Sequence, residues 1–267
     1  MPPEWLSPTT LEEALELRAD RGDEAPVVAG GTFLAVLVNQ RLLAPSAFLS
    51  LRRVPALDGI SVNGELRLGA MTTHRAVELS SAVQEGWPAL ARAFSLVASP
   101  RIRNQATVGG VLVDADYASD PPAMLVAFGA RAVARSRDGE REIPVEELIT
   151  GYYETSLRAD ELLTDVRVPA GAERAVYRKF RSRSHEDRPC VAVAAVVSEG
   201  TARVVVGAVA ERPQLFPELC TGPPAEIGRR YAEAIEPLSD ARGSAQYRRR
   251  VIAVEVRRAL EEVGWTG

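Results

Sequence analysis

The first 50 residues combine helical and strand-like spacings of hydrophobic positions. Apolar side chains recur at helical intervals from Leu11, behind a threonine cap, and predict a first helix. A short apolar run over 25–29 is typical of a buried strand, and a glycine pair ends it. A second helix is expected over 32–41 and a strand over 47–51. The spacing places three side chains of the second helix toward the core: Leu34, Leu37 and Val38.

The middle of the chain continues this mixture. A helix is expected after Thr72 or Thr73 and a longer one over 87–98, whereas 99–110 has the composition of a loop. Asp120 followed by two prolines indicates another helix start. Strands are expected at 66–68, 130–135 and 162–168.

The last third has a different order. Three strands are expected first, and two helices follow them. The ranges are 175–180, 190–197 and 202–208 for the strands, and 225–235 and 244–263 for the helices. The apolar, β-branched second and third strands predict that these strands are covered on both faces or strongly half-buried. Strands followed by helices are typical of an α+β unit. A hinge at 168–171 is therefore expected to separate two domains.

Composition narrows the class of protein. The chain has 267 residues, of which 46% are hydrophobic and 25% charged, and a formal net charge of -4. This acidic balance disfavours nucleic acid or an anionic membrane as the main partner. Arginine outnumbers lysine 31 to one, which makes the lone Lys179 a position to follow.

Cysteine and histidine are too few for most metal chemistry. Cys190 and Cys220 stand 30 positions apart, and the histidines, His74 and His185, lie near neither. Iron–sulfur clusters and structural zinc sites usually need four such ligands, so no metal site is expected. Without a disulfide framework, a signal-peptide pattern or a long apolar run, we expect a cytoplasmic protein with no integral membrane segment.

Two glycine pairs carry the strongest chemical signal. Each stands beside a threonine, in Ala29-Gly30-Gly31-Thr32 and in Thr107-Val108-Gly109-Gly110. Glycine lets the backbone approach a ligand and adopt positive φ, so consecutive N–H groups can converge on an anion. Two such turns, Gly110 at positive φ included, can hold one pyrophosphate. Taken singly, such a turn is more often an ordinary strand-to-helix connection, because Gly-Gly turns are common.

Other polar residues have structural alternatives. Asp120 caps the helix opened by Pro121, grips the hydroxyls of a ribose, or does both. Lys179 is either a solvated strand residue or a ligand contact. The two histidines are interpreted as ordinary surface or core residues. Arg101 and Arg103 are expected on a solvated loop face, with guidance of an anion as the alternative.

Seven segments, taken together, resemble the FAD-binding medium subunit of the molybdenum hydroxylases, the family of carbon monoxide and xanthine dehydrogenases. They run from the first helix to the last: AGGTFL (29–34), LRLGAMTT (66–73), RIRNQATVGG (101–110), DADYASDPPAML (114–125), ELLTDVRVP (161–169), YRKF (177–180) and SAQYRRRV (244–251). The resemblance implies a two-part FAD-binding domain of the vanillyl-alcohol-oxidase (PCMH) type over 1–170, with subdomains 1–55 and 56–170. A small α+β domain over 171–267 follows, with a three-stranded antiparallel sheet and helices.

The resemblance also implies which residues bind a non-covalent FAD. The first turn would hold the pyrophosphate from one side and the second turn from the other. Asp120 would hold the sugar end, Lys179 would lie near the flavin ring, and no residue is expected to be catalytic or to bind metal. The implied cofactor-binding residues are Val27, Val28, Ala29, Gly30, Gly31, Thr32, Phe33, Leu34, Val97, Thr107, Val108, Gly109, Gly110, Val111, Asp120, Leu163 and Lys179.

The sequence departs from the family pattern at four places in this region. Phe33 replaces a small or polar residue, often aspartate, and Val111 a common asparagine. Asp114 stands where histidine is common, and Tyr117 where proline is common. The surroundings of the flavin are therefore expected to differ from those of the relatives.

Three functions are compatible with these observations. In the leading one, FAD receives electrons from a [2Fe–2S] subunit, next to a large molybdenum-cofactor subunit, and passes them to NAD, oxygen or a quinone. The complex would be a dimer of heterotrimers. The alternatives are a stand-alone FAD-dependent oxidoreductase with its own substrate, and a non-redox assembly protein on the same fold.

Overall fold

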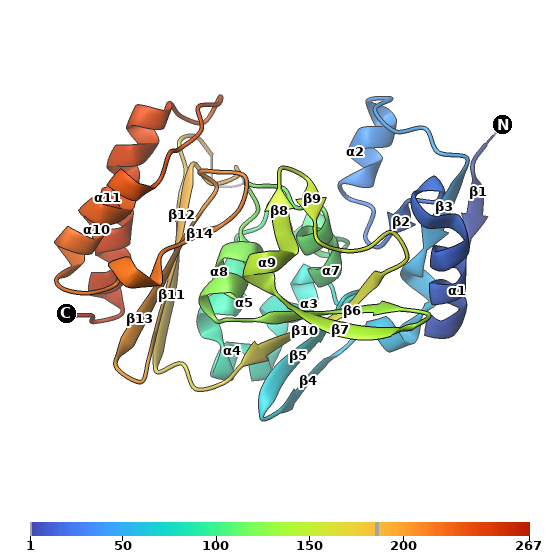
Figure 1. Ribbon diagram of the computed structural model, residues 1–267, viewed down its shortest axis with the longest axis horizontal. Coiled ribbons are helices and arrows are strands. Elements are labelled where there is room, and N and C mark those ends of the chain that lie inside the picture. Colours follow the sequence, from blue (N-terminus) through green and yellow to red (C-terminus); the bar gives the residue numbers. More distant parts are fainter. Residues whose placement is uncertain (1, 185–186) are drawn as a thin grey trace.

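A computed structural model describes residues 2–184 and 187–267, so His185 lies outside the described residues. Helices and sheets are mixed throughout the chain (Figure 1). Three larger sheets take their strands from successive parts of the sequence, in the ranges 4–50, 60–169 and 174–215.

The N-terminal sheet is parallel, in the order β1-β3-β2, with β1 at Glu4–Leu6, β2 at Val27–Val28 and β3 at Ala47–Ser50. Helix α1 (Leu11–Arg21) begins at the predicted cap, since the Thr10 hydroxyl accepts from the Glu13 N–H at 3.2 Å. Its buried face, Leu11, Ala14 and Leu15, packs into the cluster that includes β3.

Helix α2 (Leu34–Asn39) differs from the prediction. It is shorter than the expected 32–41, and none of its residues is buried. Val38, predicted to face the core, is 40% exposed. The periodicity is correct for a helix: Leu34 and Leu37 are half-buried, whereas Val36 and Val38 lie on the exposed side.

The middle sheet is antiparallel, in the order β4-β5-β10-β6-β7. Its strands are β4 (Ile60–Asn63), β5 (Glu65–Gly69), β6 (Arg131–Ser136), β7 (Gly139–Pro144) and β10 (Leu162–Pro169). The polar edge strands β4 and β7 were not predicted, because they lack an apolar pattern. The helices of this region are α3 (His74–Leu79), α4 (Ser81–Gly86), α5 (Pro88–Ser95), α8 (Pro121–Ala127) and α9 (Val145–Leu148). A small hairpin follows α9, with β8 at Ile149–Gly151 and β9 at Glu154–Thr155.

The predicted loop over 99–110 instead contains helix α6 (Pro100–Arg103) and the start of α7 (Val108–Val113). Pro100 occupies the first turn of α6, and Thr107 caps α7 through its side chain. These local start signals are present in the sequence, but neither helix is long enough to show an apolar period.

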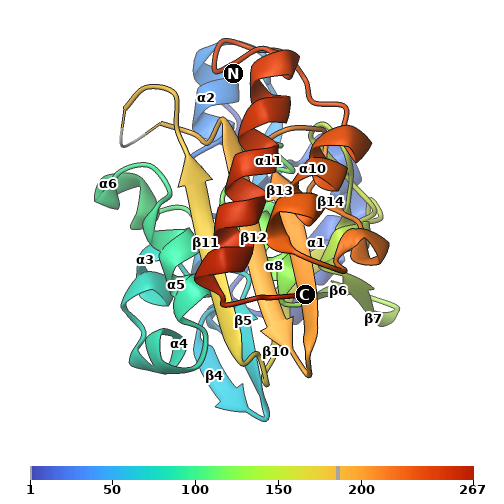
Figure 2. The same cartoon turned by 90° about the vertical axis from the view of Figure 1, so that its left-hand side faces the viewer.

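The C-terminal sheet is also antiparallel, in the order β11-β12-β13-β14. Three strands lie where they were predicted, β11 at Arg174–Phe180, β12 at Val191–Ser198 and β13 at Thr201–Gly207, and the two-residue β14 (Gln214–Leu215) adds a fourth. Helices α10 (Pro224–Ala234) and α11 (Ala245–Glu262) cover one face (Figure 2). The other face packs on α5 and α8, so β12 is buried on both sides, as predicted.

Candidate functional site

A cavity of about 570 Å³ is lined by the N-terminal sheet, the segments from α6 to α8, and β10. Its size is typical of a small-molecule or cofactor site. All but two of the residues implied by the family resemblance line it; Val28 and Val108 do not. The structure therefore brings together fifteen of them: Val27, Ala29, Gly30, Gly31, Thr32, Phe33, Leu34, Val97, Thr107, Gly109, Gly110, Val111, Asp120, Leu163 and Lys179.

The first glycine turn offers free backbone donors. Gly31 has a φ of 70°, a conformation that glycine adopts without strain. Within the described chain, the N–H groups of residues 30–34 have no hydrogen-bonding partner. An anion is the natural partner for such a run of N–H groups at a cavity wall.

Gly30 allows the two turns to meet. A Cβ on Gly30 would lie 1.9 Å from the carbonyl oxygen of Gln105 and 3.2 Å from the Cα of Ala106. Both atoms belong to the backbone just before Thr107. No side chain fits there, so glycine at this position determines the distance between the turns.

The second turn has a different role from the one predicted. The Gly110 N–H donates to the Thr107 hydroxyl at 3.1 Å, and the Gly109 N–H to the carbonyl of Ala70 at 2.8 Å. Val108 donates to Thr72 at 2.9 Å. These N–H groups hold the fold together, and Gly110 has helical rather than positive φ. The expectation that this turn offers its amides as freely as the first is wrong; its Thr107 hydroxyl still has a proton to donate.

His74 supports the second turn through a hydrogen bond to its backbone, a role that the sequence did not predict. Its Nε2 lies 3.1 Å from the Thr107 carbonyl oxygen, which can only accept, so Nε2 carries the proton. Burial lowers the pKa of His74 to about 4 and keeps the ring neutral near pH 7. Its Nδ1 is left as an acceptor without a partner among the described residues, in a side chain that lines the cavity. The sequence feature that could have indicated this role is the position of His74, the first residue of a threonine-capped helix.

Asp120 and Lys179 form a buried ion pair in the cavity wall. The Lys179 Nζ donates to Asp120 at 2.8 Å and to the Leu96 carbonyl at 2.9 Å, and the Tyr177 hydroxyl donates to the other Asp120 oxygen at 2.8 Å. Burial raises the pKa of Asp120 and lowers that of Lys179, and the attraction between the two groups opposes both shifts.

This pair corrects two expectations. Asp120 precedes α8 but makes no side-chain cap, so the helix-cap interpretation is wrong. Lys179 is not a solvated strand residue, since its side chain is 1% exposed. Direct contact also places both residues in one part of the cavity, rather than at opposite ends of a bound cofactor.

Arg103 was predicted on a solvated face but is buried, while Arg101 is exposed. The Arg103 guanidinium pairs with Glu78 at 2.8 Å and donates to the carbonyl oxygens of Val97 and Ala98 at 2.9 and 3.0 Å. These two residues line the cavity, and Ala98 has a positive φ of 39°. Arg103 therefore holds a strained piece of the cavity wall in place.

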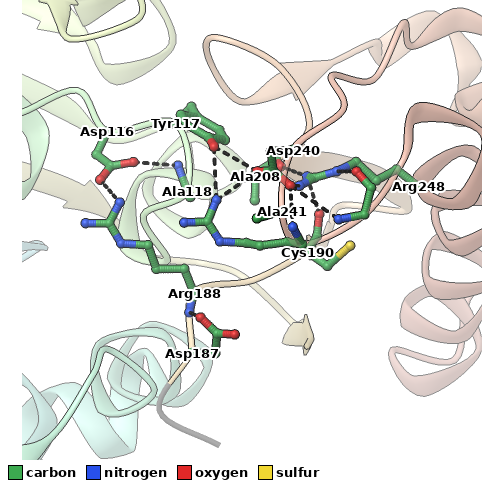
Figure 3. A network of polar contacts seen from close by, with 12 residues as sticks. Asp116, Tyr117, Ala118, Asp187, Arg188, Cys190, Ala208, Asp240, Ala241 and Arg248 are labelled. Atoms are coloured by element: carbon green, nitrogen blue, oxygen red, sulfur yellow. Dashed lines mark hydrogen bonds and ion pairs between the residues drawn. The ribbon is translucent and has the colours of Figure 1, made fainter. Parts of the chain in front are cut away.

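Carboxylates gather beside the end of α7. Asp114 and Asp116 both line the cavity. Asp116 accepts from the Ala118 N–H at 3.0 Å and from Arg188 (Figure 3). Asp114 has no ion-pair partner in the described chain. Burial, and then the charge of Asp116, raise the pKa of Asp114 to about 7, while Arg188 opposes the shift.

The neighbouring Tyr117 connects the cavity wall to the C-terminal unit. Its hydroxyl lies 2.9 Å from Asp240, which also accepts from the buried Arg248 at 2.6 Å (Figure 3). Arg248 donates in turn to the carbonyl of Cys190 at 2.6 Å. Burial opposes ionisation of Asp240, but hydrogen bonds from the Arg242 N–H and from Arg248 hold its pKa below the usual range.

Comparison with known proteins agrees with this geometry. Residues 1–171 match the family described as the FAD binding domain in molybdopterin dehydrogenase. The chain belongs to this family. The family resemblance and the FAD cofactor inferred from the sequence are thereby confirmed.

The relatives extend over nearly the whole chain. The 6-hydroxypseudooxynicotine dehydrogenase complex subunit alpha of Paenarthrobacter nicotinovorans is 34% identical, covering 96% of this chain and 93% of the relative. The carbon monoxide dehydrogenase medium chain of Hydrogenophaga pseudoflava is 30% identical, covering 96% and 95%. A solved structure of carbon monoxide dehydrogenase from the same organism superposes with a TM-score of 0.92 at 29% identity, over 99% of both chains. The chain is an FAD-binding oxidoreductase subunit of this family.

The cavity fits FAD in its chemistry. Free N–H groups at 30–34 suit a pyrophosphate, and the unpartnered His74 Nδ1 offers an acceptor to a ligand donor. Within the described residues, no group of three or more histidine, cysteine or acidic side chains is arranged for a metal ion. Cys190 and Cys220 are buried free thiols. None of the helices in 2–184 and 187–267 is long and apolar enough to cross a membrane.

Proposed function

We propose that this chain is the FAD-carrying medium subunit of a molybdenum hydroxylase complex. Its non-covalent FAD receives electrons from a [2Fe–2S] subunit and passes them to NAD, oxygen or a quinone. A large subunit with the molybdenum cofactor oxidises the substrate, and the complex is a dimer of heterotrimers in the cytoplasm. The observation that carries the proposal is the cavity beside the free N–H groups of residues 30–34, in a chain that matches the FAD-binding family over 1–171.

The fold assignment goes with this function. We assign residues 1–170 to a two-part FAD-binding domain of the PCMH type, with subdomains 1–55 and 56–170, and residues 171–267 to the C-terminal domain. The separate sheets in these ranges support the division. The largest hydrophobic cluster includes side chains from both sides of residue 170, so the two domains share part of their core.

Each part of the cavity has a task in binding. The N–H groups of 30–34 and the Thr107 hydroxyl would hold the pyrophosphate, Val97 and Leu163 give apolar contact, and the Asp120–Lys179 pair forms a polar wall. FAD supplies the electron-transfer chemistry, and the protein supplies position and electrostatics.

One test uses the isolated chain. We expect boiling to release a yellow supernatant with the chromatographic retention of FAD, because no covalent link is expected, and elemental analysis to find neither iron nor molybdenum. The chain alone should oxidise no aldehyde, purine or carbon monoxide. Colour that stays with the precipitate, or a cofactor that elutes as FMN, would contradict the assignment.

A second candidate is the stand-alone oxidoreductase, which one observation favours. The half-buried Asp114, with a pKa near 7 and a place in the cavity wall, is suited to accept a proton from a substrate. Turnover of a carbon substrate by the isolated chain at an ordinary enzyme rate, about 1 per second or more, would establish this function and overturn the relay.

Asp114 also predicts a pH dependence of FAD affinity. Below about pH 7 its carboxyl is neutral and tolerates the anionic pyrophosphate; above that pH it ionises and repels the cofactor. The charge of Asp116 adds to the negative potential, and Arg188 opposes it. If the bound form stays protonated, FAD affinity measured by fluorescence quenching should fall about fivefold from pH 7 to pH 8.

The Asp114→Asn variant should remove this dependence, whereas Glu85→Gln, on exposed helix α4, should keep it. An affinity that falls equally with pH in the Asp114→Asn variant would show that another group is responsible.

A further inference from the structure

An aromatic pair joins the first glycine turn to a distant hairpin. The ring of Phe33, inside the run of free N–H groups at 30–34, stacks on the ring of Tyr153, with centroids 5.6 Å apart and planes 6° from parallel. Tyr153 lies in the turn between β8 and β9. In Figure 1, this hairpin and helix α2, which follows Phe33, stand at the same upper side of the molecule. Phe33 lines the cavity, so the two rings meet at the edge of the cofactor site.

The backbone of Tyr153 is strained in the conformation that presents this ring. Its φ is 59°, in the left-handed region that bulky side chains rarely adopt. A neighbouring segment fixes it there, because the Tyr153 N–H donates to the carbonyl oxygen of Ala115 at 3.2 Å, and Ala115 itself has a φ of 45°. Strain of this kind persists only where surrounding contacts over-determine the backbone, and it clusters at functional sites.

The C-terminal unit supports the same hairpin through a second tyrosine of its turn. The ring of Tyr152 meets the ring of Tyr117 edge to face, with centroids 5.5 Å apart. The Tyr117 hydroxyl donates to Asp240 at 2.9 Å, and the Arg242 guanidinium lies 5.8 Å from the centre of the Tyr117 ring. The hairpin turn is therefore held between the first glycine turn and the C-terminal unit.

The first glycine turn is consequently fixed at two points. At one end, Gly30 packs closely against the backbone of Gln105 and Ala106, and at the other end Phe33 packs on Tyr153. Between these points lie N–H groups that have no partner among the described residues. A run of donors binds an anion best when it is already in place, because binding then costs no ordering of the loop.

We propose that Phe33 and Tyr153 form a positioning pair for the pyrophosphate of the cofactor. The stack holds the N–H groups of 30–34 in the arrangement that the pyrophosphate needs, although Tyr153 itself does not line the cavity. This role rests on the proposed function and adds to it a residue of the β8–β9 hairpin, a tyrosine that is 51% exposed.

The test measures the FAD affinity of deflavinated variants. Phe33→Leu and Tyr153→Leu should each weaken binding about three- to tenfold, because the turn then has to be ordered when FAD binds. Tyr153→Phe keeps the stacked ring and should bind within about twofold of the wild-type chain. The double variant Phe33→Leu, Tyr153→Leu should bind no more weakly than either single variant, since both substitutions remove the same contact.

Trp5→Leu is the matched control. Trp5 is 57% exposed and packs on Phe48 with ring centroids 5.0 Å apart, but neither residue lines the cavity. This variant should keep wild-type FAD affinity, and its melting temperature without cofactor measures the cost of losing one exposed aromatic contact. Tyr153→Leu should show a similar melting temperature. A far larger decrease would make the pair a purely structural element and overturn the proposal.

Hydrogen exchange of the cofactor-free chain reports the order of the turn directly. The N–H groups of Ala35 and Leu37 donate to the carbonyl oxygens of Gly31 and Phe33 at 2.9 and 3.3 Å. In Tyr153→Leu these amides should exchange faster than in the wild-type chain, because the turn that supplies their acceptors is less ordered. Trp5→Leu should leave their exchange unchanged.

The remaining outcomes separate the pair from the proposed function. Unchanged amide exchange in Tyr153→Leu, or wild-type FAD affinity of this variant, would overturn the positioning pair alone. Losses of affinity that multiply in the double variant would show that the two rings act separately, which also contradicts the pair. A wild-type chain that binds no FAD would overturn the proposed function itself.

Discussion

Replacing Gly30 by alanine should reduce FAD affinity by a factor of about 100 or more. The new Cβ would lie 1.9 Å from the Gln105 carbonyl oxygen and 2.7 Å from its carbon, so backbone on both sides has to move. Overpacking of this kind costs about 1–3 kcal/mol or more, and the displacement falls on the residues that would hold the pyrophosphate. The loss is measured by titrating the deflavinated variant with FAD.

Two alanine variants serve as controls. In Gly86→Ala the Cβ meets nothing within 4 Å, so affinity should not change. In Gly110→Ala the nearest atom is the Thr107 hydroxyl at 2.9 Å, which belongs to a side chain, so a smaller loss is expected. Normal FAD affinity of Gly30→Ala, with an unchanged melting temperature, would show that the spacing of the two turns does not govern binding.

Replacing Asp120 by alanine should destabilise the apoprotein by about 3–5 kcal/mol, because Lys179 would be left as an unpaired charge in a buried place. The Tyr177 hydroxyl would lose its acceptor as well. This exceeds the loss of about 1 kcal/mol that a helix cap would cause. Chemical denaturation of the cofactor-free chain measures the effect.

A matched series isolates the ion pair. Tyr177→Phe removes a single hydrogen bond to the same carboxylate and should cost about 1 kcal/mol. Asp120→Ala combined with Lys179→Met should recover much of the stability lost in Asp120→Ala, because no buried charge remains without its partner. An Asp120→Ala variant as stable as Tyr177→Phe would contradict the buried-pair interpretation.

Local signals in the sequence were sufficient for most elements of the fold. The threonine cap of α1, the apolar β-branched runs of β12 and β13, and the last helix, α11, all lie where the pattern placed them. Each depends on neighbours a few residues apart, which the sequence displays directly. Edge strands β4 and β7 were missed because they are held by backbone pairing in hairpins with the adjacent strands β5 and β6, and not by apolar side chains of their own.

The sequence by itself, through its resemblance to the family, also determined the family, the cofactor and fifteen of the residues that line the cavity. Glycine turns and their neighbours are short motifs whose chemistry can be read without coordinates. Which groups remain free to act was decided by the tertiary structure. The N–H groups of Gly109 and Gly110 are used by Ala70 and Thr107, whereas those of residues 30–34 stay available.

Long-range contacts decided the rest. The Asp120 carboxylate binds Lys179, which lies 59 positions away, and does not cap a helix. Arg103 is buried and supports the cavity wall through the carbonyl of Val97. Helix α2 kept its predicted period but lies at the surface. Periodicity reports that a helix has an apolar side; only the packing of distant segments decides how much of that side is covered.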